Sequence, residues 1–261
     1  MSSELALPDP WHHLSKWTAA RIALGRVGAS TPTRAVLDFT MDHARARDAI
    51  QTALQVDKLD KELDDRGFRS LRARSRAHDR AEYLRRPDLG RMLAPECLVQ
   101  LENPQTQTRL LTIVIADGLS ALAPMQHALP LVEMLREALS SWVLDSIVLA
   151  TQARVALADE IGQVRGAEAT IILIGERPGL KSADSLGAYL TYHPRPGRTD
   201  AERNCVSNIR PAGLSYAHAA LKLLHLLEGA RTLSRSGVDL KDESDANWIP
   251  RLATDRPNHD R

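Results

Sequence analysis

The first hundred residues show helix-like patterns of apolar and polar positions. After a loop at 25–30, Thr31 is a good helix cap, and Pro32 suits a first helical position, where no backbone N–H is needed. Apolar positions then recur at helical spacing on a charged background, at Val36, Leu37, Met41, Ala44 and Ile50. A second amphipathic unit covers 79–101 and is interrupted by Pro87. We expect no strand in this region.

The pattern changes from Arg109 onward. Short apolar runs rich in β-branched residues occur at 110–116 (LLTIVIA), 146–151 (SIVLAT) and 169–174 (ATIILI). Runs without polar alternation are typical of strands that are buried on both faces.

Helix-length segments at 130–141 and 157–164 separate these runs. Strand and helix in alternation imply right-handed crossovers, and hence an α/β fold with a doubly wound, mainly parallel, Rossmann-like sheet. A fourth run at 186–192 (LGAYLTY) is more polar and fits an edge strand, and 215–233 is expected to close the fold as a helix.

These patterns divide the chain into three regions. We expect a helical N-terminal region at 1–105, an α/β domain at 106–235, and a polar, loose C-terminal tail at 236–261. With 261 residues, 43% of them hydrophobic, the chain is long enough for one large core or two small ones.

Charge and cysteine content exclude several classes of protein. A net charge of +1 gives no field that would attract nucleic acid. The two cysteines, Cys97 and Cys205, are far apart and belong to no metal-binding or disulfide motif, which fits a reducing cytoplasm. There is no apolar run of the roughly 20 residues that span a bilayer, and no signal-peptide pattern. We therefore expect a soluble cytoplasmic protein with no nucleic-acid or membrane partner.

Polar residues follow the predicted strands, and ligands of open α/β sheets bind beyond the carboxyl ends of the strands. The segments that follow the runs are Asp117-Gly118, 152–155 (QARV), 175–178 (GERP) and 193–195 (HPR). A turn needs the glycines and the proline of GERPG, but it does not need Glu176 beside Arg177. This rim is therefore the expected ligand site.

The rim lacks the common catalytic signatures. There is no G-x-G-x-x-G, no P-loop and no G-x-S-x-G elbow around Ser120, and the nine histidines show no metal-ligand spacing. We expect Ser120 and Asp117 to cap the helix that follows them. A self-contained catalyst is hard to assemble from these residues, and no metal site is predicted.

Five blocks together are similar to one family, the small (light) subunit of ethanolamine ammonia-lyase. The blocks are 21–49 (RIALGRVGASTPTRAVLDFTMDHARARDA), 79–93 (DRAEYLRRPDLGRML), 115–123 (IADGLSALA), 174–186 (IGERPGLKSADSL) and 200–220 (DAERNCVSNIRPAGLSYAHAA). The resemblance covers the chain from about Arg21 to Ala230, and the order of the blocks makes it specific.

The resemblance implies a subunit of an adenosylcobalamin-dependent lyase of ethanolamine catabolism. In that family a large TIM-barrel subunit holds ethanolamine, and the small subunit packs against it with the cofactor between them. Cobalt–carbon homolysis starts a radical reaction that yields acetaldehyde and ammonia, so the cofactor carries the difficult chemistry. The resemblance therefore places the catalytic residues on the large subunit, and the helical N-terminal region is the expected contact with it.

The resemblance also implies the cofactor-binding residues. Val155, Glu176 and Cys205 match positions of the family's cobalamin contacts, and we add their neighbours Arg154 and Arg177 as candidates. The family keeps the cofactor's own benzimidazole on cobalt (base-on), and this sequence agrees because it has no D-x-H-x-x-G motif to replace it.

Other readings of the same residues stay open. Glu176 could pair with Arg177 or another arginine in a structural turn, while Cys205 and Val155 could belong to the core. Asn208 and Arg210 could face either the cofactor or the partner.

Alternative functions and locations also stay open. One alternative is an independent doubly wound enzyme that uses Asp117, Glu176 and a histidine of the rim on a small polar ligand, and another is a non-catalytic scaffold. Family members that enter a bacterial microcompartment carry an amphipathic N-terminal extension. Only about twenty residues with Pro8 and Pro10 precede Arg21 here, so encapsulation is not expected.

Overall fold

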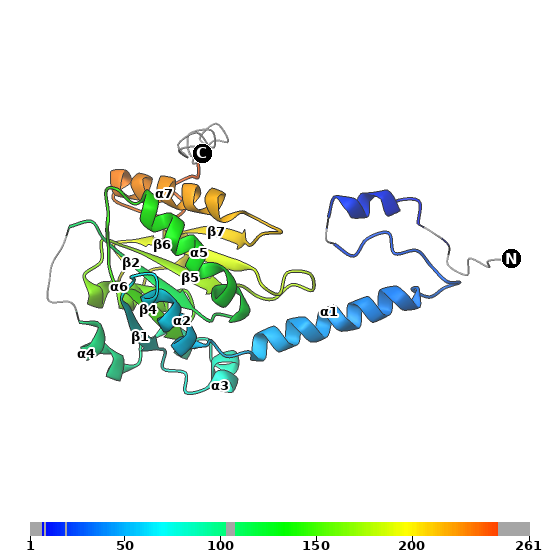
Figure 1. Cartoon of the computed structure of the whole chain (residues 1–261), viewed down its shortest axis with the longest axis horizontal. Coiled ribbons are helices and arrows are strands. Elements are labelled where there is room, and N and C mark those ends of the chain that lie inside the picture. Colours follow the sequence, from blue (N-terminus) through cyan, green and yellow to red (C-terminus); the bar gives the residue numbers. More distant parts are fainter. Residues whose placement is uncertain (1–6, 8, 19, 103–107, 245–261) are drawn as a thin grey trace, which may run out of the picture.

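The computed structural model describes residues 7, 9–18, 20–102 and 108–244, which form an α/β structure around one mixed sheet (Figure 1). The strands are β1 (Ser70–Arg74), β2 (Leu110–Ala116), β3 (Val143–Leu144), β4 (Ile147–Thr151), β5 (Ala169–Gly175), β6 (Leu186–Tyr192) and β7 (Arg203–Ile209). Within these residues the sheet has seven strands in the order β1-β4-β2-β5-β6-β7, with β3 beside β2. The pairs among β1, β4, β2 and β5 are parallel, whereas β6 and β7 extend the sheet in antiparallel fashion.

Helices cover both faces of the sheet. The α-helices are α1 (Thr33–Gln51), α2 (Val56–Asp64), α3 (Arg80–Arg85), α4 (Leu98–Leu101), α5 (Leu122–Ala138), α6 (Leu157–Arg165) and α7 (Tyr216–Leu233). The short 3-10 helices are η1 (His12–Lys16), η2 (Leu89–Arg91), η3 (Pro95–Cys97) and η4 (Asp200–Glu202). Helices α5 and α7 share one apolar cluster with the sheet, and α6 shares the other.

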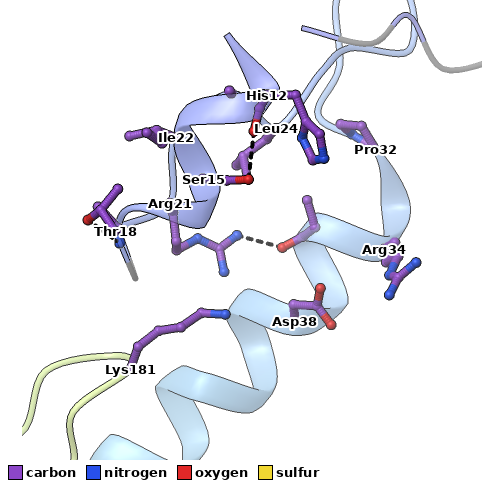
Figure 2. Close-up of a pocket in the computed structure, with 13 residues that line it drawn as sticks. His12, Ser15, Thr18, Arg21, Ile22, Leu24, Pro32, Arg34, Asp38 and Lys181 are labelled. Atoms are coloured by element: carbon purple, nitrogen blue, oxygen red, sulfur yellow. Dashed lines mark hydrogen bonds between the residues drawn. The ribbon is translucent and has the colours of Figure 1, made fainter. Parts of the chain in front are cut away.

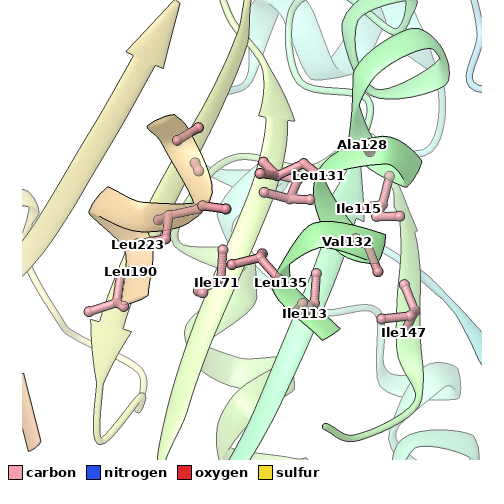
Figure 3. Close-up of a cluster of buried hydrophobic side chains, with 14 of the residues drawn as sticks. Ile113, Ile115, Ala128, Leu131, Val132, Leu135, Ile147, Ile171, Leu190 and Leu223 are labelled. Atoms are coloured by element: carbon pink, nitrogen blue, oxygen red, sulfur yellow. The ribbon is translucent and has the colours of Figure 1, made fainter. Parts of the chain in front are cut away.

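Alternating side chains of the central strands build these two clusters. On the face of α5 and α7, Ile113 and Ile115 of β2 and Ile171 of β5 pack with Leu131 and Leu223 of the helices (Figure 3). Each of these side chains is fully buried, which stabilises the fold by about 1.5–3 kcal/mol per residue. Every residue of β2 and β5 is buried, as their uninterrupted apolar runs predict.

The predicted strands at 110–116, 146–151, 169–174 and 186–192 are confirmed to within one residue at each end. The prediction of an edge position for 186–192 is wrong, because β6 pairs with both β5 and β7. The edge strand at this end of the sheet is β7, and β1 forms the opposite edge. The β7 sequence, RNCVSNI, alternates buried and exposed positions only partly, so it gave no clear strand signal.

The prediction that the first hundred residues contain no strand is wrong. Strand β1 pairs in parallel with β4, with Ser70 opposite Ile147. Its sequence, SLRAR, conceals the strand because two of its five residues are arginines that lie exposed at alternate positions. The expected boundary at residue 105 lies outside the described residues.

Three expectations about the starts of α1 and α5 are wrong. Helix α1 begins at Thr33, so Pro32 and not Thr31 is the cap residue, and no side chain caps the helix. Helix α5 begins at Leu122 and includes Pro130, at which the sequence pattern suggested a start. Ser120 does not cap α5, since its hydroxyl donates to the Ala183 carbonyl oxygen at 2.6 Å.

At the C-terminal end the expected helix is confirmed, with Ser215 accepting from the backbone N–H of His218 as its cap. The segment after it is not loose as far as residue 244, because Leu240 is buried in the core beside α7. Asn204 of β7 also bonds the backbone of Gly237 and Leu240. The rest of the expected tail lies outside the described residues.

Helix α1 extends away from the sheet and carries η1 near its far end (Figure 1). Its buried residues lie in its C-terminal half, which is nearer the sheet. They are Asp42, Ala46 and Ala49. Among the described residues, no helix combines the length and apolar character needed to cross a membrane.

The ends of β2 and β5 approach each other backbone to backbone. A Cβ atom added to Gly175 would lie 1.9 Å from the Ser120 carbonyl oxygen and 2.7 Å from that of Asp117. Gly118, with φ of +57°, faces the same contact from the other side. Glycine at 175 therefore sets the distance between the loops that follow these strands.

We predict that Gly175→Ala lowers the free energy of unfolding by about 3 kcal/mol or more, because rigid backbone blocks the methyl group. Gly166→Ala is the matched control: Gly166 has φ of +67° but nothing within 4 Å of an added Cβ. It should cost only about 1 kcal/mol, the strain of a left-handed alanine. Urea unfolding followed by circular dichroism measures both, and equal losses would contradict the close-approach argument.

Candidate functional site

One face of β7 is open to solvent. Val206 of β7 belongs to the apolar cluster of α5 and α7, so the alternate residues Cys205 and Ser207 point to the face of α6. Both residues are exposed. The sheet thus presents an uncovered surface beside α6, which we call the open face.

Glu176 lies on the same side of the sheet, one residue beyond β5. Ile172 and Ile174 contribute to the α6 cluster, and the two-residue period of a strand directs Glu176 to that side as well. Its carboxylate accepts hydrogen bonds from the hydroxyls of Ser185 and Ser207. The backbone N–H of Asn208 donates to it at 3.3 Å.

These bonds bear on the alternative reading of Glu176. Among the described residues, no ion pair joins Glu176 to an arginine, and Arg177 is exposed at the start of the following loop. The carboxylate instead connects β5 to the irregular end of β7. A negative charge held by hydroxyl and N–H donors remains an acceptor for further donors, because a carboxylate offers about four lone-pair sites.

Cys205 pairs with Tyr189 of β6 in the register of the sheet. Although the residue is exposed, partial burial of the thiol and, less strongly, the charge of Glu176 raise the pKa of Cys205, while its hydrogen bond with Tyr189 opposes this shift. Burial likewise raises the pKa of the Tyr189 hydroxyl. Both groups are therefore neutral at physiological pH, and they form a neutral patch beside the carboxylate.

Val155 lies in the turn just before α6. It packs against the α6 cluster, as Tyr189 does. Val155, Glu176 and Cys205 come from three separate segments, and the fold places all three on the same side of the sheet. That they share a site stays a prediction.

A buried aspartate fixes the loop that leads to Val155. The carboxylate of Asp117 accepts from the backbone N–H groups of Gln152 at 2.8 Å, Ala153 at 3.0 Å and Gly118 at 2.9 Å. Burial raises the pKa of Asp117 despite these bonds and the nearby Arg80. The expectation that Asp117 caps α5 is wrong, because its acceptors are used to hold the loop after β4.

Arg154 is held in place by Tyr83. Its guanidinium lies over the Tyr83 ring, 4.4 Å from the centroid, and Arg80 lies 4.8 Å from the same centroid. The Tyr83 hydroxyl donates to the Ala153 carbonyl oxygen at 3.0 Å, and the Arg154 backbone N–H donates to Gly90. Arg154 is thus held rigidly, whereas no contact within the described part of the chain brings Arg177 to the open face.

A cavity of about 590 Å³ lies at the N-terminal end of α6. Arg154 and Val155 line it from one side, and the segment 196–200 lines it from the other. Asp159 of α6 and Arg203 of β7, which form a buried ion pair, also line it. The sequence analysis missed this pair, although Arg203 lies two residues before Cys205 and so shares its face of the strand.

Asn208 lies near the end of β7, and Arg210 follows the strand directly. Asn208 has φ of +59°, and its side-chain oxygen accepts from the Arg210 Nε at 2.9 Å. Arg210 also lies 3.5 Å from the carboxylate of Asp184, in the loop that follows Glu176. The two residues stabilise this corner of the structure.

A second cavity, of about 720 Å³, lies in the N-terminal arm, which we define as residues 9–18 and 20–51 (Figure 2). Arg21 donates to the Ala35 carbonyl oxygen at 2.5 Å across it. Lys181, from the loop after Glu176, reaches to 3.9 Å from Asp42 of α1. The arm is rich in exposed large apolar side chains, which are Trp11, Leu14, Trp17, Ile22, Leu24, Val27, Val36, Leu37, Phe39 and Met41.

Comparison with known proteins identifies the family. The family model described as ethanolamine ammonia-lyase light chain matches residues 8–241. A protein of Azotobacter vinelandii named ethanolamine ammonia-lyase small subunit is 54% identical over 245 residues, which cover 92% of this chain and 91% of that protein. Proteins of the same name from Bradyrhizobium diazoefficiens (51% identical, covering 98% of this chain and 99% of that protein) and Pseudomonas fluorescens strain SBW25 (49% identical, covering 98% and 93%) also match. The chain therefore belongs to the ethanolamine ammonia-lyase light chain family.

Proposed function

We propose that this chain is the small subunit of an adenosylcobalamin-dependent ethanolamine ammonia-lyase, and that its open face supplies part of the cobalamin site. The family assignment supports the activity of the complex, the conversion of ethanolamine to acetaldehyde and ammonia. The observation that supports the location is the convergence of Val155, Glu176 and Cys205 on one uncovered side of the sheet.

The chemistry of the open face fits a corrin ring with amide side arms. Such a ring needs paired donors and acceptors, since each buried amide left unpaired costs roughly 1–3 kcal/mol. Glu176 supplies a charged acceptor, and β7 is an edge strand, so alternate backbone N–H and C=O groups point away from β6. The neutral side chains of Tyr189 and Cys205 provide contact area beside these groups.

Each candidate site residue has a binding or positioning role in the proposal. When bound, adenosylcobalamin supplies a carbon radical through homolysis of its cobalt–carbon bond. Glu176 accepts hydrogen bonds from amide side arms, Val155 and Cys205 contact the ring through backbone and side chain, and Arg154 forms the adjacent wall. Arg177, which is exposed, is the last member of this set. We assign no catalytic residue to this chain and place those groups on the large subunit.

Two finer statements belong to the same proposal. The sequence contains no D-x-H-x-x-G motif, so the cofactor should keep its own benzimidazole on cobalt (base-on). We also propose a doubly wound, Rossmann-like unit within the mixed sheet, because α5 leads from β2 to β4 on one face and α6 leads from β4 to β5 on the other. The crevice between β2 and β5, where the strand order reverses and such folds usually bind ligands, is closed by the backbone contact of Gly118 with Gly175.

The N-terminal arm is the proposed contact with the large subunit. Its exposed apolar side chains would lose their contact with water in an interface, which is favourable at about 25 cal/mol per Å². A projecting helix of 19 residues has little stability of its own, so we expect contact with a partner surface to stabilise it. We propose a cytoplasmic hetero-oligomer, for which encapsulation in a microcompartment is not expected.

We predict that ammonia release from ethanolamine requires this chain, its large subunit and adenosylcobalamin together, because no one of them holds a complete site. Co-expression of the two chains, purification and an ammonia assay with single omissions measure this. Turnover by the single chain would instead favour an independent enzyme. A complex that is active without any contribution of this chain to cobalamin binding would favour a scaffold.

We predict that Glu176→Gln raises the dissociation constant for cobalamin in the assembled enzyme by about tenfold, since hydrogen bonds to charged groups contribute roughly 1.5–3 kcal/mol. Absorbance titration with adenosylcobalamin measures it. Glu228→Gln is the matched control, because Glu228 also accepts from two side chains, those of Ser141 and Trp142, but lies on α7 at the opposite face. Unchanged affinity in Glu176→Gln would reassign Glu176 to the structure of the turn.

A further inference from the structure

The buried ion pair between Asp159 and Arg203 joins α6 to the edge strand. Asp159 is 1% exposed and Arg203 is 7% exposed. One terminal nitrogen of Arg203 donates to the carboxylate of Asp159, and the other donates to Asp200 at 2.8 Å. A single guanidinium therefore connects a helix, a strand and the loop between β6 and β7.

The pair adjoins two residues of the proposed cofactor site. Val155 comes just before α6 and Asp159 is in its first turn, and both line the cavity at the N-terminal end of α6. Arg203 lines the same cavity and precedes Cys205 by two residues, so both side chains lie on the same face of β7. The bond between Asp159 and Arg203 thus joins the segment that holds Val155 to the strand that holds Cys205.

Stability alone does not account for this pair. Removing two charges from water is costly, and replacing a buried ion pair by apolar residues is often neutral or stabilising. The Nε of Arg203 is buried and has no hydrogen-bond partner in the described part of the chain, so the guanidinium is not fully compensated. Such a pair contributes geometry, because the planar guanidinium binds Asp159 and Asp200 through different terminal nitrogens and so fixes the directions of both carboxylates relative to β7.

We propose that Asp159 and Arg203 are positioning residues, which fix the first turn of α6 against β7 so that Val155 and Cys205 meet the cobalamin at one set separation. The inference rests on the proposed function. It extends that function to residues that do not themselves touch the cofactor.

A second buried pair on the same helix provides the control. Arg165, in the last turn of α6, binds Asp145 through two nitrogens, at 2.7 Å and 2.5 Å, and both side chains are buried. This pair joins the other end of α6 to the segment before β4. It lies six residues beyond Asp159, roughly 9 Å along the helix axis. Like the first pair, it is a buried pair of aspartate and arginine with one partner on α6. It differs because it lies further from the proposed site.

The test compares Asp159→Asn with Asp145→Asn in the assembled two-subunit enzyme. Adenosylcobalamin titration should show a dissociation constant raised about tenfold in Asp159→Asn and changed less than about twofold in Asp145→Asn, since small displacements of a binding group weaken binding strongly. The turnover number at saturating cofactor should stay within about twofold of the parent in Asp159→Asn. Both variants should lower the melting temperature.

Arg203→Lys is the second variant, in case the unpaired arginine prevents Asp159→Asn from folding. It keeps the charge and loses the fork, so weaker cobalamin binding with a preserved melting temperature would support the inference. Equal weakening in Asp159→Asn and Asp145→Asn would overturn it, because the effect would then be a general loss of stability. Unchanged affinity in Asp159→Asn or Arg203→Lys would also overturn it.

The Glu176→Gln titration separates this inference from the function beneath it. If Glu176→Gln weakens binding while Asp159→Asn and Arg203→Lys do not, the positioning role is wrong and the site stands. If none of the three variants changes the affinity, the proposed site itself is wrong.

Discussion

The proposed site depends on one constraint, that β7 leaves most of one of its two faces uncovered. Val206 anchors the strand to the core of α5 and α7, while Cys205 and Ser207 are left on the side of α6 without a covering helix. The central parallel strands β2 and β5 have no such surface, because they are buried throughout. A large planar ligand can therefore approach the sheet where the antiparallel strands extend it.

A backbone contact explains why the proposed site is not at the usual place for an α/β sheet, the crevice where the strand order reverses, here between β2 and β5. Gly118 and Gly175 meet there without room for a side chain. Asp117, whose oxygens accept three backbone N–H groups, joins the end of β2 to the loop after β4 and makes that loop rigid. The loop presents Arg154 and Val155 to one side, as a fixed border of the open face.

Sequence patterns predicted the central strands because buried runs such as 169–174 have no polar interruption. They could not reveal β1 or β7, since short strands at a sheet edge carry arginine, serine and asparagine on their exposed positions. The candidates Val155, Glu176 and Cys205 came from resemblance, and no local spacing connects them. Long-range contacts such as those of Asp117 with residues 152–153, or of Asp159 with Arg203, form only after the strand order is set. From the sequence alone, a carboxylate can therefore be read equally well as a binding residue or as a helix cap, because its hydrogen-bond partners are not known.

The most direct measurement is a structure of the two-subunit complex with adenosylcobalamin bound. The account predicts the corrin ring against the open face, with an amide side arm at the Glu176 carboxylate, the backbone of Val155 and Cys205 at contact distance, and the N-terminal arm covered by the large subunit. A corrin ring bound away from β6 and β7, with these three residues exposed or buried under protein alone, would contradict it.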